Sequence, residues 1–195
     1  MNETNMDAVA ERIRLLRELE QSRELAAATQ AISQALQKGG KVLAFGNGGS
    51  ASQTSHFAAE LVNRFARARR ALAAISLAVD PASLTSIAND SEFAAVFSRQ
   101  MEALAQPGDV ALALTTSGKS ANVLEALRTA KKLGLTAIAC CGRYTDMLSA
   151  SGTDLLLAVD SIHTPIIQEM HLFLLHTIAE RVEHILCGGS HDKAL

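Results

Sequence analysis

The 195-residue sequence has no hydrophobic run of the length that a membrane-spanning helix requires. Apolar residues make up 48% of the chain, but Gly, Asp and Lys interrupt them well before about 18 in a row. The first five residues also lack the basic and apolar regions of a secretory signal. We therefore expect a soluble cytoplasmic protein without a membrane segment.

Neither sign of charge dominates, and cysteine is scarce. The 18 Lys and Arg residues against 20 Asp and Glu residues give a net charge of −2, which argues against binding to nucleic acid or to an anionic membrane. Four arginines between positions 64 and 70 form the one basic group, which we expect at the end of a helix. The cysteines lack metal-ligand spacing, so we expect buried thiols at Cys140, Cys141 and Cys187.

Periodic apolar residues predict a helical N-terminal segment followed by alternating strands and helices. From Met6 to Leu36 they recur at spacings of three and four, until Gly39-Gly40 ends the pattern. Strands are expected at 41–45, 72–76, 110–114, 135–140 and 155–159, and helices at 50–66, 82–104, 120–133 and 164–186. This alternation predicts an α/β fold, a doubly wound parallel sheet flanked by helices with an N-terminal helical extension. The length fits one domain over 1–195, with a helical segment at 1–38 and a flexible tail at 188–195.

The loop Gly46-Asn47-Gly48-Gly49-Ser50 follows the first expected strand and opens a helix. Backbone N–H groups and a hydroxyl converge at such a position, which favours an anion. A tight connection without a ligand explains the same residues, since glycine permits positive φ and Ser50 can cap the helix. The first loop alone therefore leaves both interpretations open.

A second loop adds hydroxyl groups at the end of another expected strand. Thr115, Thr116, Ser117 and Ser120 place four hydroxyls within six residues, more than one helix cap requires. The full G-x-x-x-x-G-K-[ST] motif is absent, so a nucleoside triphosphate is not predicted. Hydroxyls beside a helix N-terminus suit a single phosphate. The two loops together predict a sugar-phosphate site.

His56 and Glu60 are four residues apart and so share one face of the helix that follows the first loop. An exposed pair would contribute only about 0.2–0.5 kcal/mol. The flanking residues 57–62 are largely apolar, however, and an acid in such a helix needs a cation, a metal or a catalytic reason. Gln168 and His176 lie on one stripe of the last helix, where a lone histidine is commonly a core residue. The four side chains suit a nitrogen and oxygen metal site if the two helices meet.

Together these residues resemble the sugar-isomerase domain family, most closely its bacterial sedoheptulose 7-phosphate isomerase branch. Four separated motifs carry the resemblance in order from Gly40 onward. They are Gly46-Asn47-Gly48-Gly49-Ser50 with His56 to Glu60, then Ala88-Asn89-Asp90, then Thr116 to Val123, and finally Thr164 with Ile167 to His171 and His176.

The resemblance implies an isomerase that converts sedoheptulose 7-phosphate to D-glycero-D-manno-heptose 7-phosphate, for lipopolysaccharide or related glycans. It implies proton transfer by Glu60 and His176 through an ene-diol, with Glu60 as base and His176 as acid. It also implies one zinc ion per site. The implied zinc ligands are His56, Glu60, Gln168 and His176, and the implied substrate contacts are Asn47, Gly48, Gly49, Ser50, Asn89, Asp90, Thr116, Ser117, Ser120 and Gln168.

The resemblance further implies a homotetramer whose N-terminal helices pack between subunits, with sites completed across the interfaces. The apolar stripe Met6, Val9, Ile13 and Leu16 is compatible with that assembly. The sequence departs from the branch pattern at Gln53, His163, Ile166 and 144–146, positions that bear on the choice of sugar and on metal affinity. A glutamate that binds metal tightly is a weaker base, so the two roles of Glu60 compete.

A different class of function stays open beside the enzyme. A relative in the same family is a catalytically silent regulator of replication that binds the initiator protein, and residues 63–65 and 87–90 resemble it. That regulator characteristically lacks an acid at the position of Glu60. The presence of Glu60 together with His176 favours the enzyme over the regulator and over a sugar-phosphate sensor.

Overall fold

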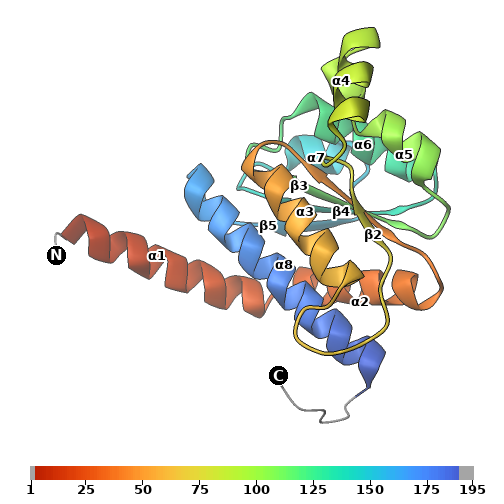
Figure 1. Ribbon diagram of the computed structural model, residues 1–195. Coiled ribbons are helices and arrows are strands. Elements are labelled where there is room, and N and C mark those ends of the chain that lie inside the picture. The colour runs from red at the N-terminus through yellow and green to blue at the C-terminus, as the bar shows by residue number, and fades with distance from the viewer. Residues whose placement is uncertain (1–2, 189–195) are drawn as a thin grey trace.

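Five parallel strands form one sheet in the computed structural model, which describes residues 3–188 (Figure 1). The predicted α/β fold with a parallel sheet is confirmed. The predicted flexible tail lies outside the described residues except for Gly188. Across the sheet the order is β2 (Ala74–Ser76), β1 (Val42–Gly46), β3 (Val110–Thr115), β4 (Thr136–Cys141) and β5 (Leu155–Ala158).

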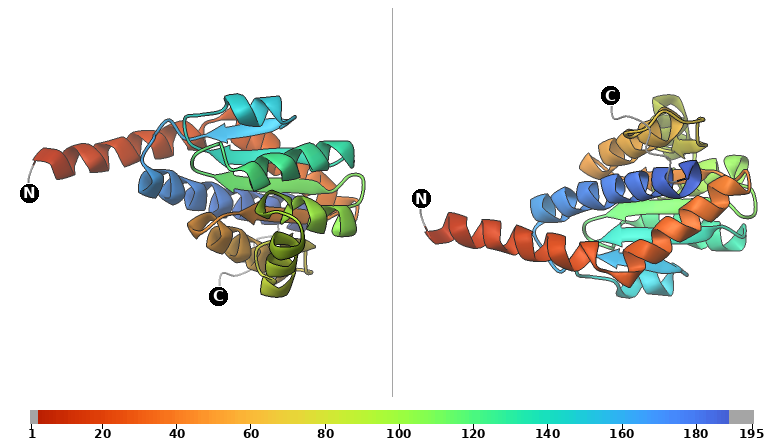
Figure 2. Two further views of the ribbon diagram at one scale, coloured as in Figure 1. Left: turned by 90° about the horizontal axis from the view of Figure 1, so that it is seen from above. Right: turned by 90° about the horizontal axis from the view of Figure 1, so that it is seen from below.

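Helices cover both faces of the sheet and bury its alternating side chains (Figure 2). Val42 and Ala44 of β1 lie in one apolar cluster and Leu43 and Phe45 in the other, because successive strand residues point to opposite faces. The first face carries α1 (Glu3–Glu20), α2 (Arg23–Gln37), α3 (Gly49–Val62) and α8 (Thr164–Cys187). The second face carries α4 (Pro81–Asp90), the 3-10 helix η1 (Phe93–Ala95), α5 (Ser98–Leu104), α6 (Ala121–Lys132) and α7 (Asp146–Ala150).

The N-terminal periodic pattern forms two helices, with the break at Gln21-Ser22. Ser22 is the N-cap of α2, and its hydroxyl accepts a hydrogen bond from the backbone N–H of Leu25 at 3.2 Å. In α1, Leu15 and Leu19 are buried in the core of the chain. None of the described helices is both long and apolar enough to cross a membrane.

The structure corrects the expected start of the helix after the first loop. The N-cap of α3 is Gly48, with a φ of 58°, and Ser50 lies inside the helix. The last helix begins at Thr164, as expected. At α3 the sequence preference for a hydroxyl cap points two residues too far along the chain, which leaves the Ser50 hydroxyl free of a capping role.

Two expectations about side chains are also wrong. The helix α3 ends at Val62, so the arginines at 64–70 lie in the connection to β2 rather than in a last helical turn. Cys140 and Cys141 are buried as expected, but Cys187 is partly exposed because it is the last residue of α8. The short helix α7 was not anticipated, since five residues are too few to show a helical period.

Burial of His171 is expected to make the stability of the fold pH-dependent. The residue is fully buried in α8, and burial lowers the pKa of His171 to about 4 from an ordinary 6.5, with the backbone of Cys141 offsetting part of the shift. The unfolded chain therefore binds this proton at higher pH than the folded chain, so the free energy of unfolding should fall as the pH drops from about 6.5 towards 4. Urea unfolding across this range should show a weaker dependence in His171→Leu than in the wild type. An equal dependence in both proteins would contradict the assignment.

Candidate active site

The two loops singled out in the sequence lie side by side at the carboxyl ends of β1 and β3. These strands are neighbours, with Gly46 paired to Leu114, and the strand order reverses between them. Ligands of open α/β sheets bind in the crevice at such a switch point. A small cavity of about 60 Å³ lies there, lined by Asn47, Ser50, Leu114, Thr115, Thr116, Ser120 and Gln168.

The cavity offers polar groups that the fold leaves available. Ser120 is the N-cap of α6, but its side chain makes no capping hydrogen bond, so the hydroxyl is free for a ligand. The first turns of α3 and α6 both begin beside the cavity, and their N–H groups and dipoles favour negative charge. Thr115, which lines the cavity without having been assigned a substrate contact, accepts a hydrogen bond from Gly118 N–H at 3.2 Å. The cavity suits the oxygens of a phosphate.

Side chains from α6 and α8 hold the first loop in place at the edge of the cavity. Asn47 and Asn122 exchange two hydrogen bonds, at 2.9 and 2.8 Å, which tie the first loop to α6. The amide of Gln168 lies so close to Gly49 that a Cβ there would approach its Nε2 to 2.6 Å. Gln53 Nε2 donates to the backbone oxygen of Gln168 at 2.7 Å. A side chain at position 49 would therefore displace the Gln168 amide from this loop.

A second hollow of about 170 Å³ adjoins the first through Thr116. Ser117 lines this hollow rather than the smaller cavity, and its hydroxyl accepts the N–H of Lys119 at 3.2 Å. The Lys119 ammonium lies 5.1 Å from the ring centre of Tyr144, a cation–π contact. The hydroxyl-rich loop thus lines two neighbouring hollows.

Asn89 and Asp90 lie apart from these hollows at the end of α4. Asp90 lines a different hollow with Ser86 and Arg99, and Asn89 Nδ2 donates to Asp90 Oδ1 at 2.7 Å. None of the side chains of α4 is fully buried, and the helix stands out from the body of the chain (Figure 1). The expected substrate contacts of Asn89 and Asp90 stay predictions.

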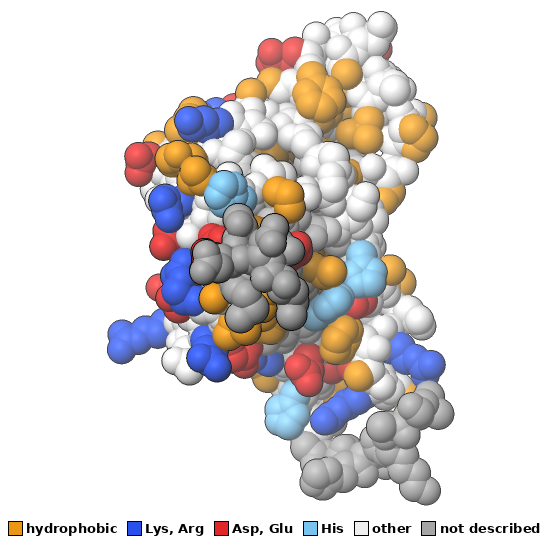
Figure 3. Space-filling view, turned by 90° about the vertical axis from the view of Figure 1, so that its left-hand side faces the viewer, with side chains coloured by type: hydrophobic (Ala, Val, Ile, Leu, Met, Phe, Trp, Pro, Cys, Tyr) orange, Lys and Arg blue, Asp and Glu red, His pale blue; other side chains and the backbone are white. Residues whose placement is uncertain are grey.

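The predicted acid/base residues meet where α3 packs against α8. Glu60 Oε1 lies 3.1 Å from His56 Nε2 and 3.5 Å from His176 Nε2, and the two histidine nitrogens are 3.1 Å apart. The side chain of Glu60 is 12% exposed, whereas the His56 and His176 side chains are 52% and 38% exposed. On the face shown in Figure 3, histidine side chains reach the surface at separate places, and at one of them adjoining histidines lie beside apolar side chains. The carboxylate is thus sheltered behind two imidazoles that solvent can reach.

The surroundings of Glu60 make it a stronger base than an ordinary glutamate. Burial raises the pKa of Glu60, and the charges of His56 and His176 offset only part of this effect. The second oxygen, Oε2, is buried without a hydrogen-bond partner in the part of the chain that the structure describes. Burying a carboxylate oxygen without a hydrogen-bond partner costs free energy. A ligand that bonds to Oε2 would offset this cost.

The same three side chains have the spacing of metal ligands. Bonds of about 2.0–2.1 Å to a tetrahedral zinc ion place neighbouring ligand atoms about 3.3 Å apart, and the three distances among His56, Glu60 and His176 are 3.1, 3.1 and 3.5 Å. Two imidazoles and a carboxylate are also a donor set that zinc accepts. Gln168 lies two helical turns from His176, about 12 Å along the axis, so its role as a fourth ligand stays a prediction.

Beyond the acid/base group, α3 and α8 run in the same direction and share further contacts. Gln168 meets the start of α3, His176 meets its middle, and Glu183 binds the segment that follows it. The ring of Phe65 packs against His176 with ring centres 5.6 Å apart. Sequence reasoning missed the contacts of Phe65 and Glu183. The one available signal was that Glu183 is an acid within the apolar run of the last helix.

Comparison with known proteins places the whole arrangement in a family. Residues 6–142 match the SIS domain. The phosphoheptose isomerase of Campylobacter concisus is 44% identical over 186 residues, 95% of each chain, and that of Crocosphaera subtropica is 49% identical over 152 residues, 78% of this chain and 77% of the relative. The solved structure of the phosphoheptose isomerase from Neisseria gonorrhoeae has a TM-score of 0.84 and 39% identity, covering 93% of this chain and 97% of that one. The chain therefore belongs to the SIS domain family and, within it, to the phosphoheptose isomerases.

Proposed function

We propose that the protein converts sedoheptulose 7-phosphate to D-glycero-D-manno-heptose 7-phosphate, with Glu60 and His176 moving the protons. The observation that carries this proposal is the contact of both side chains on α3 and α8, the same two helices that border the hydroxyl-lined cavity through Ser50 and Gln168. Membership in the phosphoheptose isomerases supports the choice of substrate. The alternative of a silent replication regulator has no support, because the acid that this regulator lacks is present as Glu60.

The distance between the small cavity and the acid/base group suits a seven-carbon substrate. Gln168 lines the cavity and His176 contacts Glu60, and they are separated by about 12 Å along α8. An extended sugar with its phosphate on C7 places about 10 Å between C1 and phosphorus, at roughly 1.2 Å per bond. One end of the substrate thus fits the cavity while the other reaches the acid/base group.

The two side chains have separate roles in the proposed chemistry. The Glu60 carboxylate takes a proton from C1 of the ketose, and the resulting ene-diol is reprotonated at C2 to give the aldose. His176 transfers the proton between the two oxygens. General acid–base catalysis of this kind raises the rate by about 10²–10⁴-fold. A zinc ion held by His56, Glu60 and His176 would supply positive charge beside the developing oxyanion.

Incubation with sedoheptulose 7-phosphate tests the proposed reaction. The purified protein should produce an aldose 7-phosphate whose anomeric proton appears by NMR. Failure to form the aldose, both as purified and after addition of zinc, would remove the proposed function.

Zinc content is expected to depend on His56. Metal analysis of protein purified without chelator should find about one zinc ion per chain in the wild type and a clear loss of zinc in His56→Ala. His184→Ala is the matched control, because His184 is exposed near the end of the same helix pair. Activity that survives complete chelation would leave Glu60 and His176 working without a metal.

A homotetramer is also part of the proposal. Val9 and Ile13 on α1 are 55% and 44% exposed, and the first half of α1 extends away from the body of the chain (Figures 1 and 2). Of the predicted apolar stripe, Leu16 packs against the core, and the side chain of Met6 lies outside the described residues. An exposed apolar patch of this kind marks a contact surface.

The double variant Val9→Ser with Ile13→Ser should therefore lower the oligomeric state. It leaves the buried Leu15 and Leu19 in place, so the fold of each chain should be kept. Light scattering measures the mass, and the isomerase assay shows whether activity falls with it. An unchanged tetramer in the variant would exclude this face of α1 as the contact.

A further inference from the structure

A buried ion pair lies next to the acid/base group without belonging to it. Arg69 Nε is 2.9 Å from Glu183 Oε1, and the two side chains are only 3% and 2% exposed. Removing two charges from water is costly, and a well-packed apolar pair at such a place often gives equal stability. The presence of this pair therefore calls for a reason other than stability.

Glu183 organises the segment that follows α3. Its two oxygens accept hydrogen bonds from three successive backbone N–H groups, those of Phe65 at 2.7 Å and of Ala66 and Arg67 at 3.0 Å each. Burial would raise the pKa of Glu183, but these N–H groups and Arg69 hold it below its usual value. The carboxylate on α8 thus fixes the backbone of residues 65–67 in one position.

Arg69 organises the end of α3 itself. Its Nη2 donates to the backbone oxygen of Glu60 at 2.7 Å, and Nη1 donates to those of Leu61 at 2.8 Å and Asn63 at 3.3 Å. The last carbonyls of a helix have no partners within it, and a cation there is favoured by the helix dipole. The guanidinium therefore binds the turn of α3 that carries Glu60.

Together the two residues act on both members of the acid/base pair. Arg69 holds the backbone of Glu60, and Glu183 holds that of Phe65, whose ring packs on His176. We propose that Arg69 and Glu183 are positioning residues for the isomerisation, which set the place of Glu60 relative to His176. This inference rests on the function proposed above.

The proposal predicts a loss of turnover without a loss of substrate binding. Glu183→Gln and Arg69→Lys should each lower kcat, by up to about 10²-fold if the groups move by about 1 Å. KM should stay within about twofold, because neither Arg69 nor Glu183 lines the small cavity at the ends of β1 and β3. If a single variant does not fold, the double variant Arg69→Met with Glu183→Leu replaces it in the assay. This double variant leaves no unpaired charge buried in the chain.

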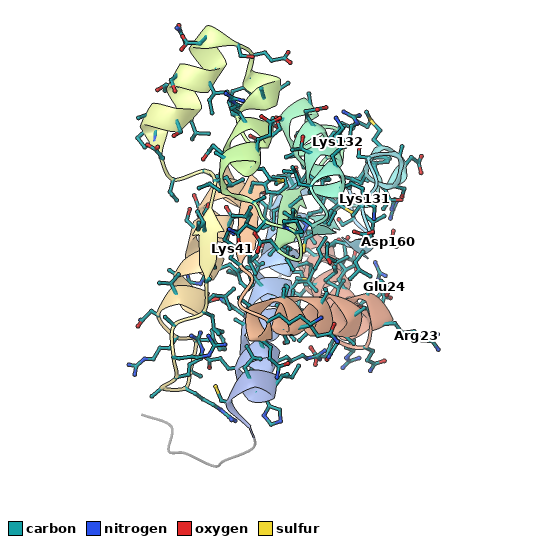
Figure 4. The ribbon with its side chains drawn as sticks, turned by 90° about the vertical axis from the view of Figure 1, so that its right-hand side faces the viewer. Arg23, Glu24, Lys41, Lys131, Lys132 and Asp160 are labelled. Carbon is teal, nitrogen blue, oxygen red and sulfur yellow. The ribbon has the colours of Figure 1, made fainter. Side chains whose placement is uncertain are left out.

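Asp109→Asn is the matched control. Asp109 is as buried as Glu183, pairs with the partly buried Lys41 at 2.6 Å, and accepts the N–H groups of Lys41 and Gln106. This pair lies where β1 and β3 begin, at the opposite end of the strands from the site, and Lys41 is labelled in Figure 4. The control should lower stability and leave kcat unchanged.

A second readout does not depend on activity. The ring protons of His176 should shift in the NMR spectra of Glu183→Gln and Arg69→Lys, because Phe65 moves away from the imidazole, and they should not shift in Asp109→Asn. A folded Glu183→Gln or Arg69→Lys protein with wild-type kcat and unshifted His176 signals would overturn the proposal, as would equal losses of kcat in these two variants and in Asp109→Asn. If the wild type proves inactive, the proposed function fails, and the His176 signals still decide whether the pair positions this residue.

Discussion

Glu60→Gln and His176→Gln are each expected to lower kcat by about 10²-fold or more while leaving the fold intact. Glutamine keeps nearly the shape of glutamate but cannot accept a proton from carbon. At position 176 it removes the imidazole to which the proposed reaction assigns proton transfer between the two oxygens. The losses should fall on kcat more than on KM, because neither side chain lines the small cavity at the ends of β1 and β3.

His184→Gln provides the control for these variants. His184 is exposed one helical turn from the end of α8, so its replacement should leave kcat unchanged. Circular dichroism shows whether each variant is folded. Folded Glu60→Gln and His176→Gln proteins with near wild-type turnover would remove both residues from the chemistry.

The double variant Thr116→Ala with Ser120→Ala should weaken binding of the phosphate ester by about 10²-fold or more, from two lost hydrogen bonds to a charged group at about 1.5–3 kcal/mol each. Both hydroxyls line the small cavity, and the Ser120 hydroxyl has no capping role. Binding of unphosphorylated sedoheptulose should change far less, because that sugar makes no use of these groups.

Calorimetry with both sugars measures this difference. Ser117→Ala is the comparison variant, because Ser117 lines the second hollow and not the small cavity. We expect a smaller effect from it than from the double variant. Equal losses of affinity for the phosphorylated and unphosphorylated sugars would count against phosphate binding in the small cavity.

Much of the fold follows from local patterns in the sequence. The strands at 110–115 and 136–141 are nearly continuous apolar runs, as expected for a sheet covered on both faces. The order of the strands is not a local property, so the switch point between β1 and β3 could not be read from the sequence. The break at Ser22 was missed because the apolar spacing continues on both sides of it.

The site was predictable where residue types cluster and unpredictable where distant helices meet. The two loops stood out by their glycines and hydroxyls. The meeting of His56 and His176 depends on α3 and α8 packing in parallel, which no spacing within either helix encodes. The roles of Arg69 and Glu183 were hidden because their partners are mostly backbone groups, which every residue carries.

The central claim is that Glu60 moves a proton between two carbons, and isomerisation in D2O tests it most directly. Wild-type protein is incubated with sedoheptulose 7-phosphate, and the C2 position of the aldose is followed by NMR. The account predicts solvent deuterium at C2 in the wild type, and a parallel loss of deuterium incorporation and aldose formation in Glu60→Gln. Aldose formation and deuterium incorporation at wild-type rates in Glu60→Gln would contradict the role of Glu60 as base.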